Sequence, residues 1–435
     1  MKTLFLNTII FFLCLDLSAQ MYFPPNNASE WETMDPKTLG WCPNKIDSLS
    51  QFLEASDTKA FILLKDGKIV LEKYMNGHTR TSNWYWASAG KTLTATLVGI
   101  AQQEKLLDIS ELTSKYLGKG WTSCTPAQED KITIRNQLTM TSGLDDGVAD
   151  PFCTLSSCLK YKADAGTRWA YHNGPYTLLD QVIEKASNRT MNQYLTQKIK
   201  NTTGMDGLFI KQDYNNVYFS TARSMARFGL LVLNKGNWNG TQILTDQKYY
   251  NDMVNTSQNI NESYGYLWWL NGKNNYMVPG LQLKIPGSLF KNAPSDMFSA
   301  LGKNGQFINV IPSQNMVWIR MGDNPDNSLV PFLFNEDVWK YINDLACTTS
   351  TSESTAISDI KVFPNPANQM ISIQYKNDAT EAADYYITNA TGTKLLNGSG
   401  LSGTVDINIG DFTPGIYFLT VTNRDVNNTY KFIKN

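Results

Sequence analysis

The sequence predicts an α/β sandwich that is interrupted by a helical region and followed by a small all-β sandwich. Strand-like segments lie near both ends of the main domain, and amphipathic helices lie between them. After Thr348 the pattern changes to short alternating segments separated by Asn, Gly and Pro, which is typical of a small β-sandwich. The chain has 435 residues, 42% of them hydrophobic and 18% charged. This globular composition leaves room for two or three domains.

Turn signals and hydrophobic periodicity place the elements of the main domain. Asp66-Gly67 stands between two apolar runs, which predicts a hairpin over residues 60–75. A helix is expected to begin near Ser88, because apolar residues recur at helical spacing from Leu93 to Ala101. Further helices are expected at about 176–187, 221–235 and 335–346, and two strands at 310–311 and 316–320, joined by a turn at Pro312.

The two ends of the chain carry targeting and linker signals. Residues 1–20 combine a basic start, an apolar stretch and a small-residue cleavage point, which indicates a secretory signal peptide. No later run approaches about 18 apolar residues, so no integral membrane segment is expected. Residues 348–357 are rich in Ser and Thr and predict a linker. The main domain is therefore expected over 21–347 and the β-sandwich over 358–435.

Cysteine usage fits an oxidising compartment. Five cysteines follow the signal peptide, so at least one is expected to be free or to pair between chains. Cys153 and Cys158 could close a small loop. Cys42 and Cys347 could tie together the two ends of the main domain. The sequence alone leaves the connectivity open.

Charge and histidine content exclude several functions. The 38 basic and 39 acidic residues give a net charge of -1, which argues against nucleic acid or an anionic membrane surface as a partner. The two histidines, His78 and His172, have no neighbouring ligands at zinc spacing. We therefore expect no metal and no cofactor, and a conventional Ser-His-Asp triad has few places to be.

Ser88-Ala-Gly-Lys91 is an S-x-x-K element, the pattern of a serine–lysine catalyst. The chain holds five such elements, so context must separate them. Only this one stands at the start of a periodic helix, directly after the aromatic patch Trp84-Tyr-Trp86. There Ser88 and Lys91 share a helix face, and N-terminal N–H groups can hold an oxyanion. A partly buried lysine loses its proton more readily, so Lys91 could accept the proton of Ser88.

Tyr171-His172-Asn173 is the second candidate element. Y-x-N occurs six times, and this copy differs in its setting: an aromatic-flanked loop after a turn at Gly166, with a helix following. A structural or surface role is expected for His172, because its side chain should point away from those of its two neighbours.

Five phrases in order resemble the β-lactamase-related serine hydrolase family, which includes class C β-lactamases, penicillin-recognising peptidases, esterases and 6-aminohexanoate-dimer hydrolases. The similarity covers roughly residues 40 to 346 and lies in the segments 86–91, 132–144, 166–179, 220–229 and 264–269. It implies a β-lactamase-like antiparallel sheet flanked by helices, with a helical subdomain.

The resemblance also implies roles for individual residues. Ser88 would be the acylated nucleophile, Lys91 its proton partner, and Tyr171 the second member of the acid/base pair. Asn173 would be a polar group that touches Lys91 and the substrate. Either Lys91 or Tyr171 could deprotonate Ser88, and a tyrosine would need a lowered pKa to do so.

The family's third element, K-T-G, has two possible registers here. Lys303-Asn-Gly305 imitates it superficially. The phrase Gly305-Gln306 instead resembles the aminohexanoate-hydrolase-like branch and places Ala300-Leu-Gly302 on the K-T-G positions. We prefer this second register, which puts the backbone N–H of Lys303 in the oxyanion hole beside that of Ser88. It removes the cation that would grip a β-lactam or peptide carboxylate.

The C-terminal region resembles a type IX secretion sorting domain. The matching pieces are 362–367, 371–373, 392–394, 412–419 and 431–434. The resemblance implies export through the periplasm and outer membrane by the type IX secretion machinery, with release or surface attachment afterwards.

These observations predict a secreted serine hydrolase that cleaves a small ester or linear amide through an acyl-enzyme on Ser88. A β-lactamase or D-amino-acid peptidase is the alternative within enzymes. A surface binding or penicillin-sensing module with idle catalytic machinery is the alternative outside enzymes.

Overall fold

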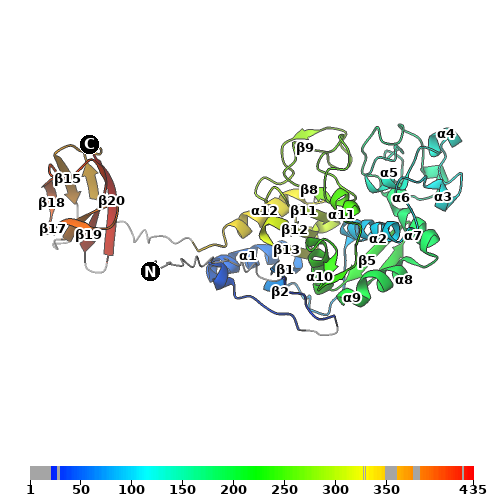
Figure 1. Cartoon of the computed structure of the whole chain (residues 1–435), viewed down its shortest axis with the longest axis horizontal. Helices are drawn as coiled ribbons and strands as arrows, with labels where there is room; N and C mark the ends of the chain where they lie inside the picture. The colour runs from blue at the N-terminus through cyan, green and yellow to red at the C-terminus, as the bar shows by residue number, and fades with distance from the viewer. Residues whose placement is uncertain are drawn as a thin grey trace, which may run out of the picture. The chain divides into compact units, whose positions relative to one another are not determined.

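The computed structural model describes residues 21–26, 30–326, 328, 330–347, 360–375, 383–423 and 426–435. The chain divides into two compact units, Met1–Ala346 and Cys347–Asn435 (Figure 1). The predicted signal peptide, residues 1–20, and the predicted linker, residues 348–357, lie outside the described residues.

The first unit is built on a 6-stranded antiparallel sheet with the order β2-β1-β13-β12-β11-β8. The strands are β1 (Thr58–Lys65), β2 (Lys68–Tyr74), β8 (Trp269–Leu270), β11 (Phe298–Gly302), β12 (Gln306–Ile311) and β13 (Met316–Gly322). The predicted hairpin is confirmed, and its turn places Asp66 and Gly67 at φ 51° and 81°, as a tight hairpin turn requires. Because β1 pairs with β13, the sheet joins the two ends of the unit.

Helices cover both faces of this sheet. Gly229 of α10 (Ala222–Leu233) lies against Val317 of β13. On the next residue of the strand, Trp318 packs against Trp339 of α12 (Phe332–Asn343). Successive strand residues point to opposite faces, so α10 and α12 lie on opposite sides of the sheet. The helix α1 (Pro43–Ala55) packs with α12 and β1, which completes a three-layer sandwich (Figure 1).

In the sequence, a helical region lies between β2 and β8, the two edge strands of this sheet, and it contains a short sheet of its own. Its centre is α2 (Lys91–Gln103), which packs against α7 (Leu179–Ser187) and is buried at every position from Lys91 to Ala101. The small sheet has the order β3-β5-β4 and consists of β3 (Trp84–Tyr85), β4 (Leu208–Gln212) and β5 (Asn215–Ser220).

Short elements complete the first unit. The α-helices are α3 (Ser114–Leu117), α4 (Pro126–Glu129), α5 (Ile134–Leu138), α6 (Asn173–Thr177), α8 (Met191–Leu195), α9 (Asn201–Thr203) and α11 (Gln247–Met253). The tighter or wider helical turns are η1 (Pro36–Leu39), η2 (Ala87–Gly90), η3 (Ser156–Cys158), η4 (Thr196–Lys200), η5 (Lys303–Gly305) and η6 (Pro312–Gln314). The remaining strands of this unit have two residues each: β6 (Asn237–Trp238), β7 (Thr241–Gln242), β9 (Asn275–Tyr276) and β10 (Ile285–Pro286).

The helix boundaries differ from the expected ones in two places. The helix expected over 176–187 is two helices, α6 and α7, separated at Leu178. The helix expected over 335–346 begins at Phe332, directly after Pro331, and ends at Asn343. Proline fixes φ and suits the start of a helix. The expected range was based on hydrophobic periodicity, which does not take Pro331 into account.

The structure settles part of the cysteine connectivity that the sequence left open. Cys153 and Cys158 form a disulfide, one of the pairings that the sequence allowed. Cys42 and Cys347 are each disulfide-bonded, and Cys124 is a free cysteine.

The second unit contains two antiparallel sheets, with the orders β14-β15-β18 and β17-β16-β19-β20. The strands are β14 (Ile360–Phe363), β15 (Met370–Tyr375), β16 (Ala383–Asn389), β17 (Lys394–Leu401), β18 (Gly403–Asn408), β19 (Gly415–Asn423) and β20 (Val426–Lys434). Ile371 and Ile373 from one sheet share a buried core with Ile387 and Leu419 from the other. The predicted all-β sandwich is therefore confirmed.

Candidate active site

Ser88 lies in a constrained turn between β3 and α2. The preceding Trp86 is fully buried: its backbone N–H donates to the carbonyl of Tyr218, and its indole N–H donates to Ser220 Oγ at 2.8 Å. Ala87 then adopts φ 46°, in the left-handed region that non-glycine residues rarely occupy. A strained backbone persists only where the surrounding packing holds it in place. Such residues are found most often at functional sites. The turn leaves Ser88 partly exposed at the N-terminal end of α2, within reach of solvent.

Lys91 is buried and its amine points to Ser88. Its Nζ donates a hydrogen bond to Ser88 Oγ at 3.1 Å, and only 5% of the residue is exposed. The Nζ also lies 4.2 Å from the centre of the Tyr176 ring and 5.3 Å from that of Tyr171. Burial lowers the pKa of Lys91 to about 7, and the opposing charge of Asp180 limits the decrease. A lysine in this environment can accept and return a proton near neutral pH.

Tyr171 approaches the same cluster from the loop before α6. Its ring stacks on that of Trp269, with 5.9 Å between centroids, and meets Tyr264 edge-on at 6.4 Å. Burial raises the pKa of Tyr171 well above its ordinary value, and a hydrogen bond with Ser88 only partly opposes this. The structure thus brings Ser88, Lys91 and Tyr171 together, with the phenol in its neutral form at neutral pH.

The two residues after Tyr171 behave differently from each other. Asn173 begins α6, and its side-chain oxygen is buried without a hydrogen-bond partner among the described residues. The contact with Lys91 that was expected for Asn173 is not among the hydrogen bonds of the described residues. His172 is buried, and both ring nitrogens lack partners in the same part of the chain. Burial lowers the pKa of His172 to about 4, so the ring is neutral near pH 7.

Gly302 brings the third element of the site against the Ser88 turn. A Cβ on Gly302 would lie 2.6 Å from the carbonyl oxygen of Trp86 and 3.1 Å from the amide nitrogen of Ala89. Only glycine allows this approach, which sets the end of β11 beside Ser88. By contrast, Gly305 packs on Arg320. The close approach at Gly302 places Lys303, the next residue, near the Ser88 turn.

Tyr176 and Asp180 belong to this cluster but were missed from the sequence. Tyr176 contacts the Lys91 amine from α6, and Asp180 is buried on α7, where Asn216 Nδ2 donates to its Oδ2 at 3.0 Å. Burial raises the pKa of Asp180 to about 7. One signal was available: Asp180 stands among the apolar residues of the buried α7 face, where an acidic side chain is out of pattern.

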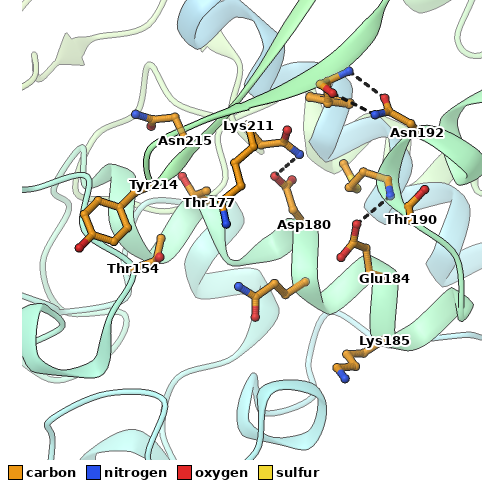
Figure 2. Close-up of a pocket in the computed structure, with 14 residues that line it drawn as sticks. Thr154, Thr177, Asp180, Glu184, Lys185, Thr190, Asn192, Lys211, Tyr214 and Asn215 are labelled. Atoms are coloured by element: carbon orange, nitrogen blue, oxygen red, sulfur yellow. Dashed lines mark hydrogen bonds between the residues drawn. The ribbon is translucent and has the colours of Figure 1, made fainter.

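Asp180 also borders a polar pocket of about 520 Å³, shown in Figure 2. Its walls come from α7, α8 and the β4–β5 hairpin, and they include Glu184, Lys211 and Asn216. Ser88, Lys91 and Tyr171 are not among the described residues that line it. Asp180 therefore lies between this pocket and the charge of Lys91, with which it interacts electrostatically.

Sequence comparison agrees with this arrangement. A family profile described as Beta-lactamase matches residues 50–327, well over half of the chain. This chain belongs to the Beta-lactamase family. The match spans the Ser88 turn, the Tyr171 loop and the turn after Gly302, and it confirms the predicted family. The comparison with curated proteins finds no matching relative.

Solved structures of several Beta-lactamase-family-like proteins share the fold. A candidate 6-aminohexanoate-dimer hydrolase from Bacillus anthracis has a TM-score of 0.55 and 20% identity, covering 75% of this chain and 91% of that one. A candidate beta-lactamase from Bacteroides dorei has a TM-score of 0.56 and 16% identity, covering 70% and 99%. A penicillin-binding protein homologue from Caulobacter crescentus has a TM-score of 0.53 and 13% identity, covering 70% and 98%. At these identities the likeness establishes the fold, which is the β-lactamase-like fold predicted.

The C-terminal unit has its own match. Residues 361–435 match a profile described as Secretion system C-terminal sorting domain, which confirms the predicted type IX sorting domain. This domain directs export by the type IX machinery, to the cell surface or the medium. Within the part of the chain that the structure describes, no helix is long and apolar enough to cross a membrane.

Proposed function

We propose that this member of the Beta-lactamase family hydrolyses a small ester or linear amide through an acyl-enzyme on Ser88. The observation that carries the proposal is the hydrogen bond of 3.1 Å between Lys91 Nζ and Ser88 Oγ. Its donor is a buried lysine whose pKa burial has lowered to about 7. A partly exposed hydroxyl next to such an amine is an activated nucleophile.

The proton first moves from Ser88 Oγ to the neutral amine of Lys91. The Oγ–carbon bond forms at the substrate carbonyl, and the carbonyl electrons move to the oxygen. The backbone N–H groups of Ser88 and Lys303 donate to this oxyanion. Collapse then breaks the bond to the leaving group, which takes a proton from the ammonium of Lys91 or through Tyr171. Water attacks the acyl-enzyme in the same way and returns Ser88 to its starting state.

Electrostatics favours Lys91 over Tyr171 as the base. A buried phenol with a raised pKa holds its proton at neutral pH, whereas Lys91 is close to half-neutral near pH 7. Tyr171, whose hydroxyl interacts with Ser88, is then suited to passing a proton to the leaving group. This assignment chooses between the two candidates that the sequence left open.

Ala300 supports an ester or linear amide rather than a β-lactam as substrate. In the preferred register it occupies the position of the K-T-G lysine, and it is fully buried. A methyl group there offers no cation to a substrate carboxylate. The β-lactamase or D-amino-acid peptidase alternative rests on the other register, in which Lys303 occupies the position of the K-T-G lysine. The side chain of Lys303 is exposed and could bind a substrate carboxylate. A binding module without catalysis is the remaining alternative.

One experiment separates these functions. The purified mature chain is treated with a fluorophosphonate probe and assayed against p-nitrophenyl esters, linear amide oligomers and a chromogenic cephalosporin. We expect labelling at Ser88, its loss in Ser88→Ala, and turnover of the esters or amides. Turnover of only the cephalosporin would favour the β-lactamase alternative, and a chain that neither labels nor turns over would favour the binding module.

A further inference from the structure

The turn η5, residues 303–305, has a left-handed backbone, which asparagine and glycine adopt more readily than other residues. Asn304 and Gly305 adopt φ 61° and 77°, in the left-handed region. The turn joins β11 to β12 and begins at Lys303, directly after the glycine that contacts the Ser88 turn. A donor to an oxyanion must stay fixed during the reaction, because a shift of about 1 Å can cost about 10²-fold in rate. Contacts that hold the turn from outside therefore bear on the position of this donor.

Arg320 of β13 contacts the turn from its buried side. It is fully buried, and its Nη1 donates to the carbonyl oxygens of Asn304 at 2.6 Å and Gly305 at 3.1 Å. Its other donors reach the carbonyls of Ser56 and Asp323 and the hydroxyl of Thr58. Among the described residues no carboxylate forms an ion pair with it, so a full charge is buried on neutral acceptors. The carboxylates of Asp323, Asp57 and Asp326 favour the charged form only from a distance. Burying a guanidinium without a direct ion pair is costly, which argues against a mere packing role.

Two further side chains complete the attachment of the turn. Gln306 is buried, and its amide donates to the carbonyl of Lys303 at 3.2 Å and to that of Gly322 at 2.7 Å. On the solvent side, Asn304 Nδ2 donates to the hydroxyl of Tyr85 at 2.8 Å. A Cβ on Gly305 would lie 2.6 Å from Arg320 Nη1, so glycine leaves room for the guanidinium.

We propose that Arg320 is a positioning residue for the hydrolase reaction. Its guanidinium, assisted by the Tyr85–Asn304 hydrogen bond, fixes the turn so that the N–H of Lys303 faces the oxyanion formed at Ser88. This inference rests on the proposed function and adds to it the group that holds the oxyanion donor in place. Arginine suits the task because its rigid fork binds two carbonyls at once and keeps its charge, unlike lysine.

The test replaces the guanidinium of Arg320 with an ammonium group, which keeps the positive charge. Arg320→Lys in the mature full chain is assayed with a p-nitrophenyl ester, and we expect kcat to fall about 10- to 100-fold while KM changes less than about 3-fold. Arg227→Lys is the matched control. Arg227 is also buried and donates to the carbonyls of Pro24, Pro25 and Thr203, far from the turn in the chain. It should lose thermal stability, as Arg320→Lys does, with kcat kept.

The outcomes separate the two proposals. If the unmodified chain is not labelled at Ser88 by the fluorophosphonate, the proposed function fails. If it is labelled but Arg320→Lys keeps the kcat of Arg227→Lys, only the positioning role is overturned. Should Arg320→Lys not fold, Tyr85→Phe decides: it removes one oxygen at a half-buried site, and an unchanged kcat in that variant would overturn the proposal.

Discussion

Lys91 and Arg320 are both buried cationic side chains at the edges of one site, yet their surroundings differ. Among the residues that the structure describes, Lys91 has a single hydrogen-bond partner, Ser88 Oγ, and aromatic rings lie around its amine. Arg320 donates to five oxygen acceptors. Few partners make the charged form costly, so the pKa of Lys91 falls to about 7. Burial lowers the pKa of Arg320 to about 9, which leaves it charged at neutral pH.

This difference separates a group that moves a proton from a group that holds a structure. A lysine with one weak partner can change its charge during each catalytic cycle. An arginine with all its donors engaged cannot, and it gains rigidity instead. The comparison suggests that, in this protein, the number of hydrogen bonds given to a buried nitrogen cation decides its role. Changes that exchange or remove these surroundings test that idea.

The largest effect is expected from replacing the amine of Lys91 with a guanidinium like that of Arg320. In Lys91→Arg the charge is kept but cannot be removed near neutrality, so Ser88 loses its base. We expect kcat for a p-nitrophenyl ester to fall by about 10³-fold or more. Labelling by the fluorophosphonate should slow in parallel, with circular dichroism confirming the fold. A variant that keeps a tenth or more of the activity would show that Lys91 is not the base.

The oxyanion donor gives the next largest effect. Lys303→Pro removes one N–H and should reduce kcat about 10²- to 10³-fold. Proline suits this position, because Gly302 has φ -123° and ψ 160°, the extended backbone that favours a following proline. Lys303→Ala keeps the N–H and should lose far less activity. Equal losses in the two variants would remove the backbone role of Lys303.

These residues also show what the sequence could and could not predict. The Ser88–Lys91 pair was predictable because it is local: four consecutive residues at a helix start, after an aromatic patch. The fold was predictable from the hairpin, the periodic helices and the five family phrases. Arg320 was not, because its role depends on the pairing of β13 with β1 and β12 and on a turn reached through that sheet. Asp180 likewise acquires its role only when α7 packs against α2.

His172 extends the comparison to a buried nitrogen base whose ring nitrogens have no hydrogen-bond partner among the described residues. The carboxylates of Asp146 and Asp145 favour its charged form, but less than burial opposes it. Its pKa falls from 6.5 to about 4 through burial, so the unfolded chain takes up a proton before the folded chain does. The contribution to stability is complete above pH 6.5 and is lost as the pH falls towards 4, by up to about 3 kcal/mol. Unfolding in urea at a series of pH values measures this. In His172→Phe the free energy of unfolding should fall less steeply as the pH decreases from 6.5 to 4. An unchanged pH dependence would contradict the assignment.

Asp180 gives the smallest and most specific effect. Its charge raises the pKa of Lys91 against the effect of burial, so Asp180→Asn should lower the pKa of the base further. Because activity requires neutral Lys91, kcat/KM should rise with pH around an inflection near 7 in the unmodified chain. In Asp180→Asn that inflection should move to lower pH, by about 1 unit for a buried opposite charge nearby. The pH profile with a p-nitrophenyl ester measures the shift. A shift to higher pH would show that the inflection does not report the ionisation of Lys91, because loss of a neighbouring carboxylate cannot make a buried ammonium easier to keep.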